Sequence, residues 1–120
     1  GIAPLMGMLR ALADRGDRRP LVLFYAYRRW ERMTFREAIE DLRGRLNLRV
    51  IYVLAEPPEG WTGETAQIGA DILDRHLPPN RGDLHYFMCG PEAMTHVVER
   101  ALYGLNVPLG RLHTELFDLV

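Results

Sequence analysis

Continuous apolar runs alternate along this chain with stretches of helical periodicity. Apolar runs rich in β-branched and aromatic residues predict buried strands, whereas apolar residues repeated every three to four positions predict amphipathic helices. The expected strands are residues 21–27, 48–54, 84–88 and 112–117. The expected helices are residues 3–15, 34–47, 66–76 and 91–103. This alternation predicts an α/β fold, a three-layer, Rossmann-like parallel sheet with helices on both faces.

Turn and cap residues mark the ends of several elements. Gly16 and Gly104 follow helical stretches and are predicted to cap them. Thr34 and Glu37 have the spacing of a capping box at a helix start. Residues 59–65 read as a polar, glycine-containing loop carrying Trp61, which could pack against an adenine or cover the sheet edge.

Composition narrows the possible functions. The chain has 120 residues and a net charge of −1, so we expect one domain, residues 1–120, and no nucleic-acid partner. All fifteen residues counted as Lys+Arg are arginine, and there is no serine. A serine nucleophile, a Schiff-base lysine and a phosphate-loop lysine are therefore excluded. No signal peptide or spanning segment is apparent, and we expect a cytoplasmic domain, or one on the cytoplasmic side of a membrane-bound parent protein.

The turn after the third predicted strand is the first candidate site. In open α/β sheets ligands collect at the carboxyl ends of the strands. There Gly90 lets a ligand approach the backbone, and Pro91 suits the first position of a helix. Cys89 is then expected at the rim of the sheet. The alternative is that a lone cysteine is simply a small buried hydrophobic residue.

Two helix starts share one pattern. Ala3-Pro4 and Gly90-Pro91 each open a helix with proline, and two helix N-termini facing one crevice would offer N–H groups to a pyrophosphate. This arrangement predicts a dinucleotide site. The four histidines show no metal-ligand spacing with one another or with Cys89, so we expect no metal site.

Several motifs together resemble one family, the ferredoxin-NADP reductase-like flavoenzymes. Gly1-Ile2-Ala3-Pro4 is similar to the second half of that family's Gly-x-Gly-Ile-x-Pro turn, and Met88-Cys89-Gly90-Pro91 is similar to its Cys-Gly-Pro motif. Residues 24–28, 33–37, 58–61 and 113–117 also resemble family segments. The resemblance covers essentially the whole chain. It is greatest to the nicotinamide-binding half of bacterial ferric-reductase-like and oxygenase-reductase proteins.

The resemblance implies hydride transfer from NAD(P)H to FAD, followed by single-electron transfer to iron, haem or an iron–sulfur partner. Cys89 would touch the nicotinamide and hold its C4 near the flavin, which is catalysis by positioning. Phe117 would lie near the flavin face. The implied cofactor-binding residues are Gly1, Ile2, Ala3, Pro4, Arg28, Ala55, Glu56, Cys89, Gly90, Pro91 and Met94.

Cofactor choice is expected to depend on the end of the second strand. NADPH-using members of the family commonly carry a Ser-Arg pair there, whereas this chain has Ala55-Glu56. A carboxylate accepts hydrogen bonds from ribose hydroxyls and repels a 2′-phosphate, so NADH is the expected cofactor. Arg28 and Arg29 end the neighbouring strand and could restore phosphate binding. Alternatively, Glu56 merely points into solvent.

Two departures from the family pattern indicate a fragment of a larger flavoprotein. The Arg-x-Tyr-Ser/Thr flavin motif is absent, so FAD is expected on a separate domain of the same chain or a partner chain. The first strand is also absent, so the expected sheet order is 3-2-1-4-5 with strand 1 upstream of Gly1. A non-catalytic regulatory module that binds a nucleotide on the same scaffold remains the alternative.

Overall fold

A computed structural model describes residues 2–116 of the chain. The chain divides into two compact units, one formed by residues 6–67 and the other by residues 68–120 together with residues 1–5. We describe each unit by itself. Gly1 and Phe117, two of the predicted site residues, lie outside the described residues.

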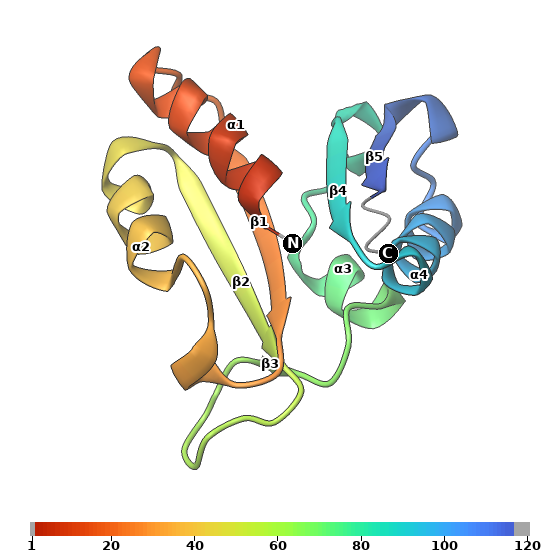
Figure 1. The fold of residues 1–120 in the computed structure, drawn as a ribbon. Coiled ribbons are helices and arrows are strands. Elements are labelled where there is room, and N and C mark those ends of the chain that lie inside the picture. The colour runs from red at the N-terminus through yellow and green to blue at the C-terminus, as the bar shows by residue number, and fades with distance from the viewer. Residues whose placement is uncertain (1, 117–120) are drawn as a thin grey trace. The chain divides into compact units, whose positions relative to one another are not determined.

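The 6–67 unit is built around a parallel sheet with the order β1-β2-β3 (Figure 1). β1 (Leu21–Tyr27) and β2 (Leu48–Leu54) pair along their whole lengths, from Leu21 opposite Leu48 to Tyr27 opposite Leu54. The two-residue β3 (Glu64–Thr65) adds to the end of β2. The helices of this part are α1 (Ala3–Asp14), η1 (Trp30–Arg32) and α2 (Arg36–Arg45).

Apolar side chains from the strands and both α-helices form the core of this unit. The buried residues are Met6, Leu9, Ala13, Leu23, Tyr25, Met33, Ile39, Leu42, Leu46, Leu48, Ile51, Val53 and Leu54. The helix positions recur every three to four residues, so each helix buries one stripe and leaves its charged face in water. This packing holds the carboxyl ends of β1 and β2 side by side.

The second unit contains a parallel pair of strands. β4 (Tyr86–Gly90) pairs with β5 (Leu112–Leu116), and α3 (Ala70–His76) and α4 (Glu92–Gly104) pack against each other. The short helices η2 (Arg81–Asp83) and η3 (Leu109–Arg111) precede the two strands. The core consists of Ile2, Ile68, Ile72, Leu73, Leu77, Thr95, Val98, Leu102 and Val107. None of the helices in the described part of the chain is long and apolar enough to cross a membrane.

The predicted α/β class with parallel strands is confirmed, and β1 and β2 have the predicted bounds. The single sheet is not seen, because the described strands form one three-stranded and one two-stranded sheet. Among the described strands, the first and third predicted strands are therefore unpaired with each other. The order 3-2-1-4-5 stays a prediction. β3 was missed, because two residues carry no periodicity.

Helix ends differ from the predictions in several places, one being α3, which begins at Ala70 and not at residue 66. α2 has no capping box: its N-cap is Phe35, at φ 61°, without a side-chain hydrogen bond. Gly16 caps α1 as predicted, at φ 68°, whereas the left-handed residue after α4 is Asn106, at φ 70°, and not Gly104. Pro91 is the N-cap of α4 and not its first residue.

Candidate functional site

The predicted Cys89-Gly90-Pro91 motif lies where β4 meets α4. β4 is Tyr86–Gly90 and not residues 84–88, so Cys89 and Gly90 are its last two residues and do not follow it. Cys89 is half-buried, Gly90 is buried and ends the strand, and α4 begins immediately after Pro91. The Thr95 N–H donates to the Pro91 carbonyl over 3.1 Å, the first bond of the helix. The N-cap residue Pro91 makes no side-chain hydrogen bond to this end of α4, and the first turn carries one acidic residue, Glu92.

Gly90 lies in close contact with Met94, a residue of the helix that follows it. Its φ is 157°, and a Cβ atom at this position would lie against the Met94 Cε, well inside van der Waals distance. Met94 is half-buried in the first turn of α4. The approach of a ligand, predicted from the sequence, and the contact with Met94 both favour glycine at this position.

Residues 2–5 belong to the same compact unit as this turn. Ile2 is buried, with 8% of its surface exposed, whereas Ala3 is exposed and Pro4 half-buried. α1 begins at Ala3, so Pro4 lies in the first helical turn, where its missing N–H removes no helical hydrogen bond.

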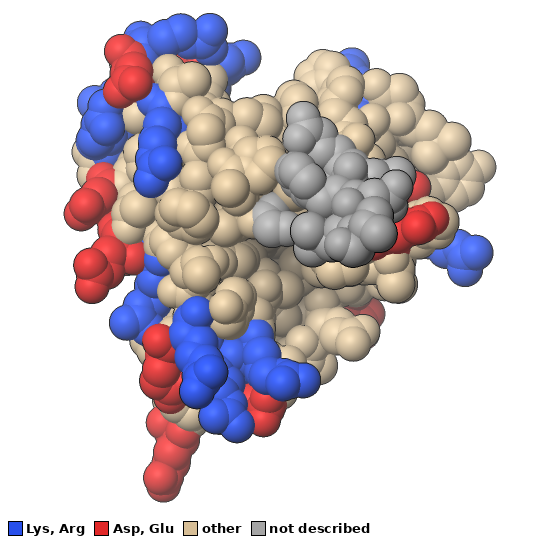
Figure 2. All heavy atoms as spheres, viewed as in Figure 1, with Lys and Arg blue, Asp and Glu red and all other residues tan. Residues whose placement is uncertain are grey.

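The other predicted site residues meet at the carboxyl ends of β1 and β2. The backbone ladder continues past the strands, with hydrogen bonds from Ala55 N to Tyr27 O (3.0 Å) and from Glu56 N to Arg28 O (2.8 Å). The Glu56 carboxylate pairs with Arg28 Nε through Oε2 at 3.1 Å, and with Arg29 NH2 through Oε1 at 3.5 Å. We call Arg28, Arg29 and Glu56 the strand-end triad. Basic and acidic side chains lie close together over this end of the sheet (Figure 2).

The triad contradicts one of the two interpretations of Glu56 that the sequence left open. Glu56 does not merely point into solvent, because both of its carboxylate oxygens take part in ion pairs. Its side chain is 49% exposed and that of Arg28 is 78% exposed, so the triad remains open to a ligand. Ala55 is exposed beside it.

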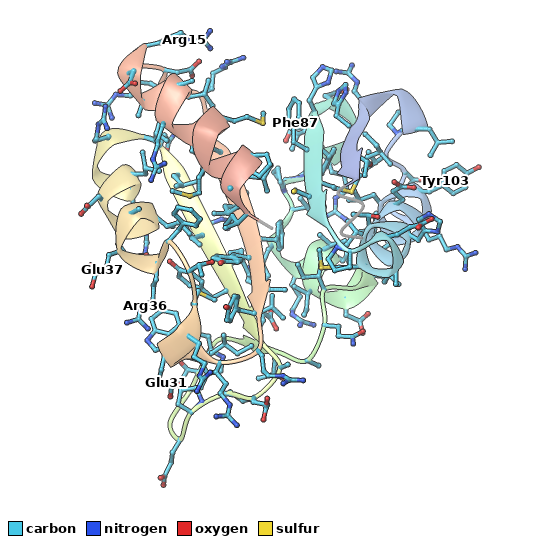
Figure 3. The ribbon with its side chains drawn as sticks, in the orientation of Figure 1. Arg15, Glu31, Arg36, Glu37, Phe87 and Tyr103 are labelled. Atoms are coloured by element: carbon cyan, nitrogen blue, oxygen red, sulfur yellow. The ribbon has the colours of Figure 1, made fainter. Side chains whose placement is uncertain are left out.

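An aromatic cluster near the β2–β3 edge was not predicted. The Trp30 ring packs edge-on against Tyr52, with centroids 5.0 Å apart, and lies 5.4 Å from the Trp61 ring. The Arg36 guanidinium lies over the Trp30 ring at 4.5 Å, and Arg36 is labelled beside η1 in Figure 3. The Trp61 N–H donates to the Glu64 carbonyl over 3.0 Å. Trp61 thus contacts the sheet edge, one of its two predicted roles, and packing against an adenine stays a prediction.

This cluster borders an open hollow of about 590 Å³. Three of its polar groups pair with one another: the Tyr52 hydroxyl donates to Glu40 over 2.8 Å, and Arg43 pairs with the same carboxylate. Burial raises the pKa of Tyr52, and the bond to Glu40 raises it further, so this phenol stays protonated. Within residues 2–116, no cluster of three or more potential metal-ligating side chains occurs.

Comparison with known proteins identifies the family. Residues 1–100 match the family model described as the oxidoreductase NAD-binding domain, and the chain belongs to this family. A similar curated protein is NADH-cytochrome b5 reductase 1 of Pyricularia oryzae, which is 31% identical over 124 residues, covering 100% of this chain and 40% of the relative. The same enzyme of Cryptococcus neoformans var. neoformans serotype D is 30% identical over 130 residues, covering 100% of this chain and 44% of the relative. The chain thus spans less than half of these relatives.

Solved structures agree with this assignment. The cytochrome b5 reductase and CS domains of human Ncb5or, in the NAD+ form, have a TM-score of 0.78 and 25% identity, covering 95% of this chain and 33% of that one. The flavohem-like FAD/NAD binding domain of Vibrio cholerae nitric oxide dioxygenase has a TM-score of 0.85 and 20% identity, covering 98% and 47%. The resemblance to ferredoxin-NADP reductase-like enzymes and the predicted NAD-binding class are confirmed.

Proposed function

We propose that this chain is the NADH-binding domain of a flavin-dependent reductase. In this reductase a hydride passes from NADH to FAD on another domain, and single electrons then reach iron, haem or an iron–sulfur centre. The observation that carries the proposal is the Cys89-Gly90-Pro91 turn, which leads into a helix start without a side-chain cap. It occurs in a chain of the oxidoreductase NAD-binding family, whose relatives include NADH-cytochrome b5 reductases.

Each unit by itself offers groups that fit one part of a dinucleotide. The N-terminal N–H groups of α4, a helix of 13 residues, suit a phosphate, because they are not capped by a side chain and carry the positive end of the helix dipole. The Glu56 carboxylate can accept hydrogen bonds from ribose hydroxyls. In the proposed assignment Ile2, Ala3 and Pro4 border the cofactor near the β4–α4 turn. Gly1 and Phe117 keep their predicted roles beside the cofactor and the flavin.

The residues of the turn position the cofactor and do not react with it. NADH, when bound, supplies the hydride, and the FAD domain supplies its acceptor. Cys89 would hold the nicotinamide by contact through its polarisable sulfur, and Gly90 would keep the strand end free of a side chain. Because FAD is assigned to another domain, we expect this chain alone to bind NADH without oxidising it.

The test uses Cys89→Ala. Calorimetry measures NADH binding to the chain, and stopped-flow absorbance measures flavin reduction in a flavoprotein that carries this chain beside its FAD domain. We expect Cys89→Ala to slow flavin reduction by about 10- to 100-fold, because it loosens the positioning of the nicotinamide. The thermal unfolding midpoint should hardly change, because the thiol is only half-buried. Tyr103→Ala is the control, since Tyr103 is 66% exposed and projects outward from α4 (Figure 3).

Two outcomes would contradict the proposal. A large loss of stability with normal flavin reduction would make Cys89 a core residue. NADH binding without flavin reduction in the wild-type flavoprotein would indicate a regulatory nucleotide-binding module instead.

A further inference from the structure

The strand-end triad leads to a specific account of cofactor choice, which rests on the proposed function. We propose that Glu56 selects against a 2′-phosphate mainly by occupying Arg28 and Arg29, and less by its negative charge. The carboxylate would act as an internal competitor, and the chain would contain a latent phosphate site formed by two arginines.

The contacts support occupation of the arginines. Each carboxylate oxygen of Glu56 pairs with a different guanidinium, Oε2 with Arg28 Nε at 3.1 Å and Oε1 with Arg29 NH2 at 3.5 Å. Guanidinium groups are well matched to phosphate oxygens, because their planar N–H donors form paired hydrogen bonds. A phosphate that entered the triad would therefore have to displace the carboxylate from the groups that suit it best.

Backbone hydrogen bonding holds Glu56 next to the two arginines. The hydrogen bond from Glu56 N to Arg28 O, at 2.8 Å, continues the hydrogen bonding of the parallel β1–β2 pair beyond the strands. The three side chains therefore project from neighbouring strand ends, and they can contact one another without a rearrangement of the backbone. Their exposed fractions of 78%, 53% and 49% for Arg28, Arg29 and Glu56 leave the triad reachable by a nucleotide.

The charge balance argues against simple repulsion. Two arginines and one glutamate give the triad a formal charge of +1 (+2 − 1), so a phosphate monoester of about −1.5 to −2 meets a positive cluster. Repulsion from Glu56 alone would then be offset by its neighbours. A carboxylate has about four lone-pair positions and the triad uses two, which leaves acceptors for the 2′- and 3′-hydroxyls of NADH.

The experiment compares two probes on the 120-residue chain. Adenosine 2′,5′-bisphosphate carries the 2′-phosphate, and adenosine 5′-monophosphate is the matched probe without it. Affinities are measured by calorimetry, and 31P NMR reports the environment of the 2′-phosphate. The variants are Glu56→Gln, Arg28→Gln with Arg29→Gln, and the combination of all three. Glu59→Gln removes the same charge from an exposed position three residues further along and serves as the control.

If Glu56 occupies the arginines, Glu56→Gln should raise affinity for the bisphosphate by about tenfold and leave the monophosphate nearly unchanged. In the background without Arg28 and Arg29, the same substitution should gain about twofold or less, because no guanidinium is released. Glu59→Gln should leave both affinities unchanged.

The outcomes separate this inference from the proposed function. An equal gain from Glu56→Gln in both backgrounds would show that repulsion alone is responsible and would overturn the inference. No gain in either background, with normal monophosphate and NADH binding, would also overturn it while leaving the proposed function intact. If neither probe nor NADH binds to any variant or to the wild type, the nucleotide-binding function itself fails.

Discussion

The terminal methyl group of Met94 lies in the space where any residue other than glycine at position 90 would carry its Cβ atom. Gly90 is the last residue of β4, and Met94 lies in the first turn of α4. The contact therefore joins the strand end to the helix start across the Cys-Gly-Pro turn. A side chain at position 90 therefore has to displace the end of the Met94 side chain.

We expect Gly90→Ala to reduce the free energy of unfolding by about 1–3 kcal/mol, because alanine is strained at φ 157° and the end of the Met94 side chain has to shift. Adding Met94→Ala should recover part of this loss, although the strain at φ 157° remains. Gly7→Ala is the control: Gly7 lies inside α1 with nothing within 4 Å of its missing Cβ, so alanine should stabilise by up to about 1 kcal/mol. Urea unfolding measures all three. A neutral Gly90→Ala would show that Met94 moves aside freely.

The start of α2 gives a second prediction. Tyr25 is buried, and its hydroxyl donates to the Thr34 carbonyl over 2.9 Å and lies 2.8 Å from Thr34 Oγ1. Thr34→Val should therefore lower the free energy of unfolding by about 0.5–1.5 kcal/mol, because it removes the hydrogen bond between Thr34 Oγ1 and the Tyr25 hydroxyl. Glu37→Ala should change it by less than about 0.5 kcal/mol, since no capping box exists. Comparable losses of stability for Thr34→Val and Glu37→Ala would show that the two residues do form a capping box.

The turn after α1 gives a pH prediction. A hydrogen bond from the Arg19 side chain, helped by the Arg19 backbone N–H, lowers the pKa of Asp17 from 3.8 to about 2. Because the folded pKa is the lower one, this pair stabilises the fold above pH 3.8, and the contribution is lost as the pH falls towards 2. NMR titration of the carboxyl carbon should give a midpoint near 2, and Arg19→Gln should return it towards 3.8. An unshifted midpoint in the wild type would show that the pair does not persist in solution.

The sequence predicts strands better than it predicts their partners. β1 and β2 have the expected bounds because each is one unbroken apolar run between polar residues. Their arrangement into two sheets depends on hydrogen-bond partners, which hydrophobic patterning does not specify. Burial along a helix is also only partly specified: Val97 in α4 is apolar and yet 49% exposed, because an apolar residue at the edge of a helical stripe can lie on either side.

In the candidate site, too, the positions of residues could be predicted from the sequence but their partners could not. Cys89, Gly90 and Glu56 could be placed at strand ends because glycine and proline mark where the apolar runs stop. The pairing of Glu56 with Arg28 and Arg29 could not be predicted, since it follows from the register of β1 on β2. The Trp30–Tyr52 contact was missed for a similar reason: it joins a short helix to a strand, and neither segment signals the other.

Two helix ends share one hydrogen-bond pattern and lead to the last prediction. After α1, Gly16 N bonds Ala13 O at 3.0 Å and Asp17 N bonds Leu12 O at 3.0 Å. After α4, Asn106 N bonds Tyr103 O at 3.1 Å and Val107 N bonds Leu102 O at 3.0 Å. Both are Schellman motifs, with Gly16 and Asn106 in the left-handed position at φ 68° and 70°.

Because Gly104 is helical and Asn106 is the left-handed residue, substitutions at the two positions should have opposite signs. Gly104→Ala should raise the free energy of unfolding by up to about 1 kcal/mol through helix propensity. Asn106→Ala should lower it by about 1 kcal/mol, as Gly16→Ala should at the matching position of α1, because alanine is strained in the left-handed conformation. Asn106→Gly should be neutral or stabilising, since glycine adopts this conformation most easily. Chemical denaturation of the four variants measures these differences. A destabilising Gly104→Ala together with a neutral Asn106→Ala would show that Gly104, and not Asn106, caps α4.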